Sequence, residues 1–228
     1  YQSEGGYAEL VTVPAENIVP IPDRIGFVEA AAFPLTFLTA WHMLVTRAEL
    51  RPGETVLILA AGSGVGQAAI QVARAQGARV IVTAGSEQKL ARARKLGAHE
   101  GIDHYSQDIP KEVRRFTDRR GVDVVFEHVG QATWEQSMKS LRRGGRLVTC
   151  GATTGPSVSI DIRHLFSRQI SLVGSFMGSK GELLKAAELF FDGTFTPVID
   201  RTYPLEAAAE AQGRLEDKAQ FGKIVLTV

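Results

Sequence analysis

The stretch from Thr55 to Ser86 constrains the fold most strongly, because its pattern predicts a strand, a glycine turn, a helix and a second strand. Val56 to Ala60 is a short apolar run typical of a buried parallel strand, and Arg79 to Ala84 is a second such run. The glycine turn, residues 61–66, lies where the predicted helix begins. There, unpaired N–H groups and the helix dipole favour binding of a pyrophosphate.

A glycine pattern alone is weak, because left-handed turns and close packing of a helix on a strand also require glycine. A bare structural turn therefore stands as the alternative. The flanking strand and helix supply the context that the motif needs, and they favour a nucleotide site.

Composition limits the other function classes. The chain has 228 residues, 44% of them hydrophobic, and 26 basic against 25 acidic residues give a net charge of +1. This balance predicts neither a nucleic acid nor a membrane surface as partner. One cysteine, Cys150, permits no internal disulfide and no cysteine-rich zinc cluster. No apolar run reaches about 20 residues and no signal-peptide pattern is present, so we expect a cytoplasmic protein.

Segments before the central stretch have a different character. Tyr7 to Val13 and Asn17 to Ile21 predict two short strands interrupted by prolines, and Phe27 to Leu50 predicts a helix broken at Pro34. Because the sequence opens at Tyr1 directly in strand-like material, we expect a piece of a longer protein.

After Ser86 the alternation of strands and helices continues. Further strands are predicted at 101–104, 122–129, 146–150 and 170–177, and helices at 88–96, 109–117 and 134–141. Six strands with intervening helices predict an α/β fold, a doubly wound parallel six-stranded sheet. A helix at 181–191, a strand at 198–203, a helix at 205–215 and a strand at 223–228 follow. We therefore expect three parts: 1–38, a nucleotide-binding domain at 39–177, and 178–228.

The end of the second strand bears on cofactor choice. Sites specific for NAD place Asp or Glu there to bind the ribose 2′-hydroxyl, whereas this chain has Ala84-Gly85-Ser86 followed by Lys89. A small neutral slot and a lysine favour the 2′-phosphate of NADP(H), with His104 or Arg92 as further donors. Glu87 would oppose this if it pointed inward. In the alternative reading, Ser86 only caps the next helix.

The ends of the later strands border the same crevice, because ligands of open α/β sheets lie beyond the carboxyl ends of the strands. His128 is the candidate acid or base, although a histidine there more often bonds a ribose or a backbone carbonyl. Cys150 is interpreted as packing rather than as a nucleophile. The full set at these ends is Glu127, His128, Val129, Gly130, Cys150, Gly151, Ala152, Thr153, Thr154, Phe176 and Met177.

Several motifs occur together in a familiar order. They are PLTFLTAW, RPGETVLILAAGSGVGQAAIQVA, HVG, GGRLVTCGATTG and the closing FGKIVL. Jointly they resemble the medium-chain dehydrogenase/reductases, in particular the zinc-type alcohol dehydrogenase and quinone oxidoreductase branches. The resemblance covers essentially the whole chain and implies a Rossmann fold flanked by remnants of a GroES-like β-rich catalytic domain.

The resemblance also bears on metal and cofactor. Leu35 stands where classical zinc enzymes of the family place a cysteine ligand, so zinc is not expected in this chain, and its presence elsewhere in a longer protein stays open. Ser63 replaces the family's middle glycine. The cofactor-binding positions implied by the resemblance or by the strand ends are Thr39, Ser63, Gly64, Val65, Gly66, Ser86, Lys89, His104, His128, Val129, Gly151, Thr153, Phe176, Met177 and Lys223.

The implied function is an oxidoreductase that transfers a hydride between NADPH and a small alcohol or carbonyl, a quinone or an enone. A nucleotide-binding module without catalysis, with a sensor or structural role, is the alternative. A methyltransferase fits less well, because it also needs an acid after the second strand. The family further implies a homodimer formed through the sixth strand, Ile170 to Met177, and a small molecule as substrate.

Overall fold

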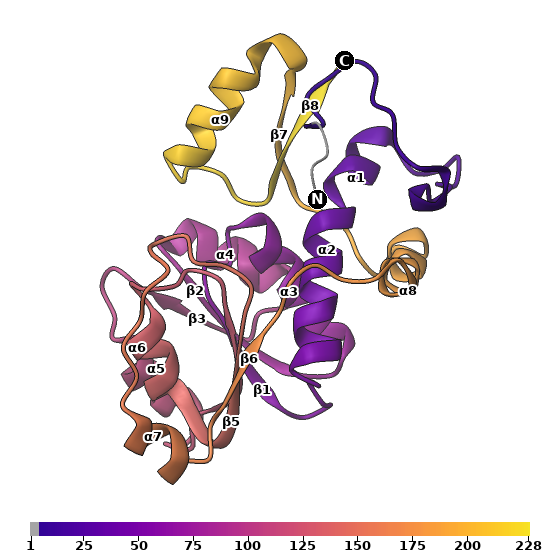
Figure 1. Cartoon of the computed structure of the whole chain (residues 1–228). Helices are drawn as coiled ribbons and strands as arrows, with labels where there is room; N and C mark the ends of the chain where they lie inside the picture. Colours follow the sequence, from indigo (N-terminus) through magenta and orange to yellow (C-terminus); the bar gives the residue numbers. More distant parts are fainter. Residues whose placement is uncertain (1–4) are drawn as a thin grey trace.

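A parallel six-stranded sheet forms the centre of the structure, a computed structural model that describes residues 5–228 (Figure 1). The strands follow the order β3-β2-β1-β4-β5-β6, so the doubly wound Rossmann arrangement is confirmed. Their bounds are β1 Thr55–Ile58, β2 Arg79–Ala84, β3 Glu100–Asp103, β4 Val122–Glu127, β5 Leu141–Thr149 and β6 Ser171–Gly174. The order reverses between β1 and β4, which places a ligand crevice beyond their carboxyl ends.

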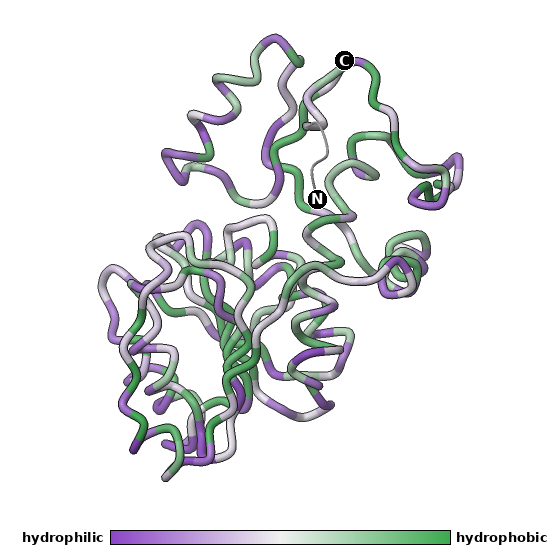
Figure 2. Tube along the Cα trace, viewed as in Figure 1, coloured by the Kyte–Doolittle hydropathy of each residue, from purple (hydrophilic) through white to green (hydrophobic). Residues whose placement is uncertain are grey.

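Helices cover both faces of this sheet because alternate strand residues are apolar on both sides. Ile58 and Val80 face one core, which includes residues of α3 (Gly64–Ala75) and α4 (Glu87–Lys95). Leu57 and Val125 face the other core, with α5 (Ile109–Phe116) and α6 (Trp134–Ser140). Figure 2 shows the strands as a hydrophobic centre, with hydrophilic residues towards the outside.

The remainder of the described chain lies outside the sheet, and residues of its helices at 33–44 and 186–190 pack in the same core as the strands (Figure 1). It comprises η1 Ala15–Asn17, α1 Phe27–Ala32, α2 Pro34–Trp41, the π-helix η2 His42–Arg47, α8 Lys180–Phe191, β7 Ile199–Pro204, η3 Leu205–Ala207, α9 Ala208–Glu216 and β8 Lys223–Thr227. The predicted helix break is confirmed, since Pro34 begins α2 at a position that tolerates proline. Stacked rings of Phe33 and Phe190, with centroids 4.4 Å apart, join α8 to the segment before α2.

Two predicted strands are wrong. Residues 7–13 and 17–21 form no strand, and only the short η1 interrupts this segment. Leu10 is 89% exposed, and within residues 5–228 no strand pairs with residues 7–13. The alternating pattern alone therefore does not make a strand there. Consequently the predicted β-rich remnant consists there of β7 and β8 alone. Residues 1–4 of the predicted segment 1–38 lie outside the described residues.

Some element bounds also differ from the prediction. A helix that the sequence pattern missed, α7 (Ile162–Ser167), precedes β6. Strand β5 begins at Leu141 rather than Arg146, and β6 ends at Gly174 rather than at Met177. Met177 has a left-handed backbone (φ 55°), which a continuing strand does not allow.

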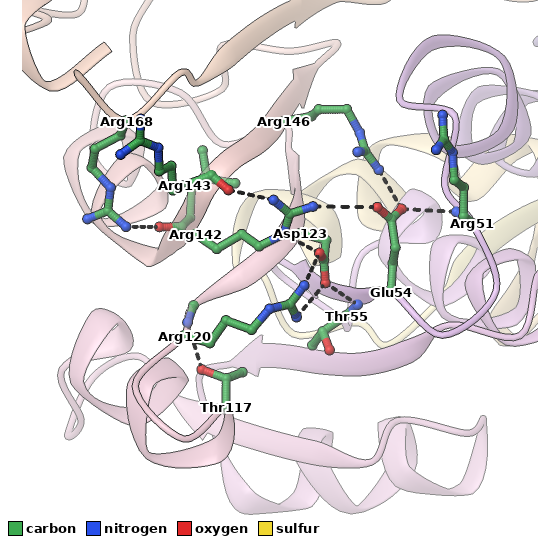
Figure 3. Close-up of polar contacts among 12 residues, drawn as sticks. Arg51, Glu54, Thr55, Thr117, Arg120, Asp123, Arg142, Arg143, Arg146 and Arg168 are labelled. Carbon is green, nitrogen blue, oxygen red and sulfur yellow. Dashed lines mark hydrogen bonds and ion pairs between the residues drawn. The ribbon is translucent and has the colours of Figure 1, made fainter. Parts of the chain in front are cut away.

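Ion pairs close the amino end of the sheet (Figure 3). Asp123, at the start of β4, accepts the backbone N–H of Thr55 at 2.8 Å and is paired with Arg120 and Arg142. Glu54, just before β1, is paired with Arg146 and approached by Arg142. Each buried or half-buried carboxylate at this end therefore has a guanidinium partner.

Candidate cofactor site

The glycine turn after β1 is packed too tightly for larger residues. A Cβ built on Gly66 would lie 2.4 Å from the carbonyl oxygen of Ala60, so only glycine fits there. The Ser63 hydroxyl caps α3 by accepting the N–H of Gly66 at 2.9 Å. Helix geometry leaves the N–H groups of Gly64 and Val65 without intrahelical acceptors, as an anion site at a helix N-terminus requires.

The end of β2 collects positive charge. Ser86 caps α4 and accepts the N–H of Lys89 at 3.3 Å, so the alternative structural role predicted for Ser86 is confirmed. The Lys89 ammonium donates to the carbonyl oxygen of Lys218 at 2.6 Å. Burial lowers the pKa of Lys89, and the carboxylate of Asp200 opposes that shift. The side chain of Glu87 is engaged by Arg94, further along the same helix.

An aromatic wall stands beside these lysines. A Cβ on Gly85 would lie 2.6 Å from the Tyr105 ring and 3.2 Å from Nε2 of His104, so glycine permits the close approach of both rings. Burial lowers the pKa of His104; the charge of Asp103 opposes this shift, whereas the charges of Lys89 and Lys218 add to it. The predicted pair Lys89 and His104 is therefore brought together at one place.

The sequence pattern missed Lys218. It lies in the segment after α9, more than a hundred residues from Lys89 in the chain. No local motif marks this lysine, because its role depends on how the C-terminal segment packs against α4. Arg92, in contrast, is held over the ring of Phe221, 4.3 Å from the ring centroid, and pairs with Asp200.

The closing FGK motif docks on the glycine turn. Gly222 donates its N–H to the carbonyl oxygen of Gly62 at 2.9 Å. The aliphatic stem of Lys223 covers Gly64, since a Cβ there would lie 3.0 Å from Cδ of the lysine. Burial lowers the pKa of Lys223. Lys223 thus stands at the predicted pyrophosphate position.

His128 does not stand free as an acid or base. Its Nε2 donates to the carbonyl oxygen of Leu59 at 3.0 Å, the bond to a backbone carbonyl that was the alternative reading. Burial lowers the pKa of His128 and favours the neutral ring. Burial likewise raises the pKa of the Cys150 thiol, with the charge of Glu127 adding to it, in line with Cys150 as packing.

The loops after β4 and β5 are tied to each other. The Thr153 hydroxyl donates to the carbonyl oxygen of His128 at 3.2 Å, and the Thr154 hydroxyl donates to that of Val129 at 2.8 Å. A Cβ on Gly151 would lie 2.8 Å from the His128 carbonyl oxygen. The predicted residues of these two loops therefore form one continuous wall.

A cleft of about 650 Å³ lies against this wall. His42 and Arg47 of the π-helix line it, together with five of the residues predicted at the strand ends: Gly130, Cys150, Gly151, Ala152 and Phe176. Phe176 is 78% exposed and Met177 half-exposed. Thr39, in α2, donates its hydroxyl to the carbonyl oxygen of Leu35 at 2.7 Å.

The described residues contain neither a metal-binding cluster nor a membrane-spanning helix. Within residues 5–228, no three histidine, cysteine, aspartate or glutamate side chains are grouped so as to hold a metal ion. Leu35 is 59% exposed and supplies no ligand atom. In that same range, no helix combines the length and the apolar character needed to cross a membrane.

Known proteins share both the sequence and the fold. The family model "zinc-binding dehydrogenase" matches residues 64–192. A quinone oxidoreductase of Pseudomonas aeruginosa is 34% identical over 97% of this chain and 71% of its own length. A crotonyl-CoA reductase of Streptomyces avermitilis is 33% identical over 96% of this chain but only 54% of its own length. The chain thus spans between 54% and 71% of the length of these relatives.

Solved structures agree with this result. A crystal structure described as an NAD-dependent alcohol dehydrogenase superposes with a TM-score of 0.94 and 48% identity, over 98% of this chain and 65% of that one. The 2-octenoyl-CoA carboxylase reductase CinF, solved with NADP and 2-octenoyl-CoA, gives a TM-score of 0.84 and 33% identity over 91% of this chain and 51% of that one. The chain therefore belongs to the medium-chain dehydrogenase/reductase superfamily and contains its Rossmann-fold part.

Proposed function

We propose that this chain binds NADP(H) and forms the cofactor-binding part of an oxidoreductase that transfers a hydride between NADPH and a small alcohol or carbonyl, a quinone or an enone. The relatives are quinone oxidoreductases, a crotonyl-CoA reductase and an alcohol dehydrogenase, which supports the reaction class. When bound, the nicotinamide supplies or accepts the hydride, and the chain's own residues hold and orient it.

The observation that carries the choice of cofactor is the positive charge at the end of β2. The charges of Lys89 and Lys218 gather there beside the ring of His104, and no carboxylate stands at the position that would bond a ribose 2′-hydroxyl. A 2′-phosphate would receive charge-assisted hydrogen bonds from these groups, whereas the 2′-hydroxyl of NAD(H) would leave them unused.

The other groups follow from their places in the fold. The N–H groups of Gly64 and Val65 would hold the pyrophosphate, with Gly66 allowing its approach and Lys223 adding a charge. The loops at Val129, Gly151 and Thr153 would border the nicotinamide, with Thr39, Phe176 and Met177 completing that end. In this arrangement Ser63 and His128 support the site through the bonds described above.

We also propose a homodimer that forms through β6. This strand ends the sheet order, so one of its edges has no neighbouring strand within residues 5–228. Ile162 and Phe166, in the helix before it, are 68% and 67% exposed. A second copy would cover this edge and these apolar side chains. Size-exclusion chromatography with light scattering measures the mass directly.

A fluorescence titration of the chain with NADPH and with NADH tests the cofactor proposal. We expect NADPH to bind at least tenfold more tightly than NADH, because the Lys89 ammonium makes a contact with the 2′-phosphate, which NADH lacks. Lys89→Glu should weaken NADPH binding at least tenfold and leave NADH nearly unchanged. Lys95→Glu, the same charge change at an exposed site of α4, is the control.

The result also decides between this proposal and the NAD-dependence of the 48% identical relative. Equal affinity for the two cofactors would refute the preference for NADPH. Equal losses for both in Lys89→Glu would refute the role of Lys89. If neither cofactor bound, the proposed function as a whole would fail.

A further inference from the structure

Glu127, the last residue of β4, is a carboxylate buried without a positive partner. It has no exposed surface. Its Oε1 accepts the N–H groups of Val129 and Gly130 at 2.7 and 3.0 Å. Its Oε2 lies 2.6 Å from the Ser137 hydroxyl and 3.0 Å from that of Thr133. All four donors are neutral, and no ion pair reaches this carboxylate within residues 5–228.

These bonds give Glu127 a mechanical role. Through Val129 and Gly130 it fixes the loop after β4, and through Thr133 and Ser137 it fixes the start of α6. The Thr154 hydroxyl and N–H both donate to the carbonyl oxygen of Val129, at 2.8 Å each. The position of the loop after β5 therefore depends on that of the loop after β4. Glu127 therefore holds the wall of the cleft without lining it.

The bonds also have an electrical consequence. Several neutral donors can hold an ionised carboxylate in the interior, but they do not cancel its charge. Gly130, bonded directly to the carboxylate, and Cys150, whose pKa the charge of Glu127 raises, both line the cleft. The charge of Glu127 therefore makes a negative contribution to the potential at that end of the cleft, where Gly130 and Cys150 lie; Arg47 lines the same cleft and contributes the opposite sign.

We propose that Glu127 is a positioning residue whose uncompensated buried charge favours the oxidised nicotinamide over the reduced one. This rests on the proposed function, which places the nicotinamide at Val129 and Gly151. The oxidised ring carries a positive charge and the reduced ring does not, so one fixed negative charge stabilises the two forms unequally. At about 10 Å and an effective dielectric constant of about 20, the attraction changes an equilibrium constant roughly tenfold.

Glu127→Gln separates charge from shape, because glutamine keeps the size and can still accept the two N–H bonds. Dissociation constants of NADP⁺ and NADPH are measured by calorimetry for the wild-type chain and the variant. We expect the ratio of NADPH affinity to NADP⁺ affinity to rise about three- to tenfold in Glu127→Gln. Glu135→Gln, a charge removal at an exposed site of α6, is the control and should leave the ratio unchanged.

Glu127→Asp supplies the second test, and serves alone if Glu127→Gln does not fold. It keeps the charge but shortens the side chain, so both affinities should fall together while their ratio stays within about twofold of wild type. The proposal would be overturned if the ratio of NADPH affinity to NADP⁺ affinity stayed the same in Glu127→Gln. It would also be overturned if this ratio shifted as much in Glu127→Asp as in Glu127→Gln. Failure of the proposed function would look different: the wild-type chain would then bind neither nucleotide.

Discussion

Strand β4 carries a buried carboxylate at each end, and the two are satisfied in opposite ways. At the amino end, Asp123 is 1% exposed and meets two guanidinium groups. At the carboxyl end, Glu127 is fully buried and meets only hydroxyl and N–H donors. The two ion pairs of Asp123 compensate its charge locally, so this carboxylate serves to hold the amino end of the sheet together. The neutral donors at Glu127 leave a charge that can act on a ligand.

At the carboxyl end, Gly66, Gly85 and Gly151 each bring backbone or rings closer than a Cβ allows. These close approaches open space for a nucleotide along the turn and the strand ends. At the amino end, arginine side chains fill the corresponding region (Figure 3). One sheet thus carries the proposed cofactor site at one edge and a set of ion pairs at the other.

The largest effect should come from Asp123→Asn. This change removes the charged partner of Arg120 and leaves Arg142 with only the more distant carboxylate of Glu54, at a cost of about 3 kcal/mol in the free energy of unfolding. Glu127→Gln should cost only about 1 kcal/mol, because its partners are neutral and most of its bonds survive. Urea unfolding followed by circular dichroism measures both. Equal losses at the two positions would break the comparison.

Acid sensitivity should also differ between the two ends. Burial alone would raise the pKa of Asp123, but the N–H of Thr55 and the bonds from Arg142 and Arg120 lower it below its usual value. Its stabilising contribution is therefore present above about pH 4, its unfolded pKa, and is lost as the pH falls through the lower folded pKa. We expect Asp123→Asn to flatten the decline of stability below pH 4. An unchanged slope would show that Asp123 does not contribute to acid sensitivity.

A smaller effect should appear at Cys150, the chain's one cysteine. Burial raises the pKa of its thiol first, and the charge of Glu127 raises it further. Glu127→Gln should therefore increase the thiolate fraction and speed alkylation by iodoacetamide about threefold at pH 8. Glu135→Gln, a charge removal at an exposed site of α6, is the control. A rate that did not respond to Glu127→Gln would mean that this carboxylate carries no charge near the cleft.

The sequence predicted best where one segment determines its own structure. Residues 79–84 form a strand with the predicted bounds, because an apolar run between two glycines packs in only one way. The glycine turn, the caps at Ser63 and Ser86 and the place of Lys89 follow from local spacing as well. Residues 7–13 show the limit, since an alternating pattern makes a strand only where another strand pairs with it.

The contacts that complete the site depend on distant segments. Lys218 reaches Lys89 from after α9, and nothing in its neighbours marks it. Glu127 was identifiable as a strand end, but two of its four donors, the hydroxyls of Thr133 and Ser137, reach it only because α6 packs against β4. The sequence therefore predicted which edge of the sheet carries the proposed site, and the structure adds how charge is arranged along that edge.

Hydrogen–deuterium exchange of the chain with and without NADPH tests most directly whether the cofactor binds at the carboxyl edge of the sheet and leaves the amino edge unaffected. We predict slower exchange in residues 61–66, 86–89 and 128–130, where the backbone borders the proposed nucleotide site, and unchanged exchange in residues 51–55 and 120–123. Protection centred on the arginine-rich amino end, or none at the glycine turn despite saturating NADPH, would contradict the account.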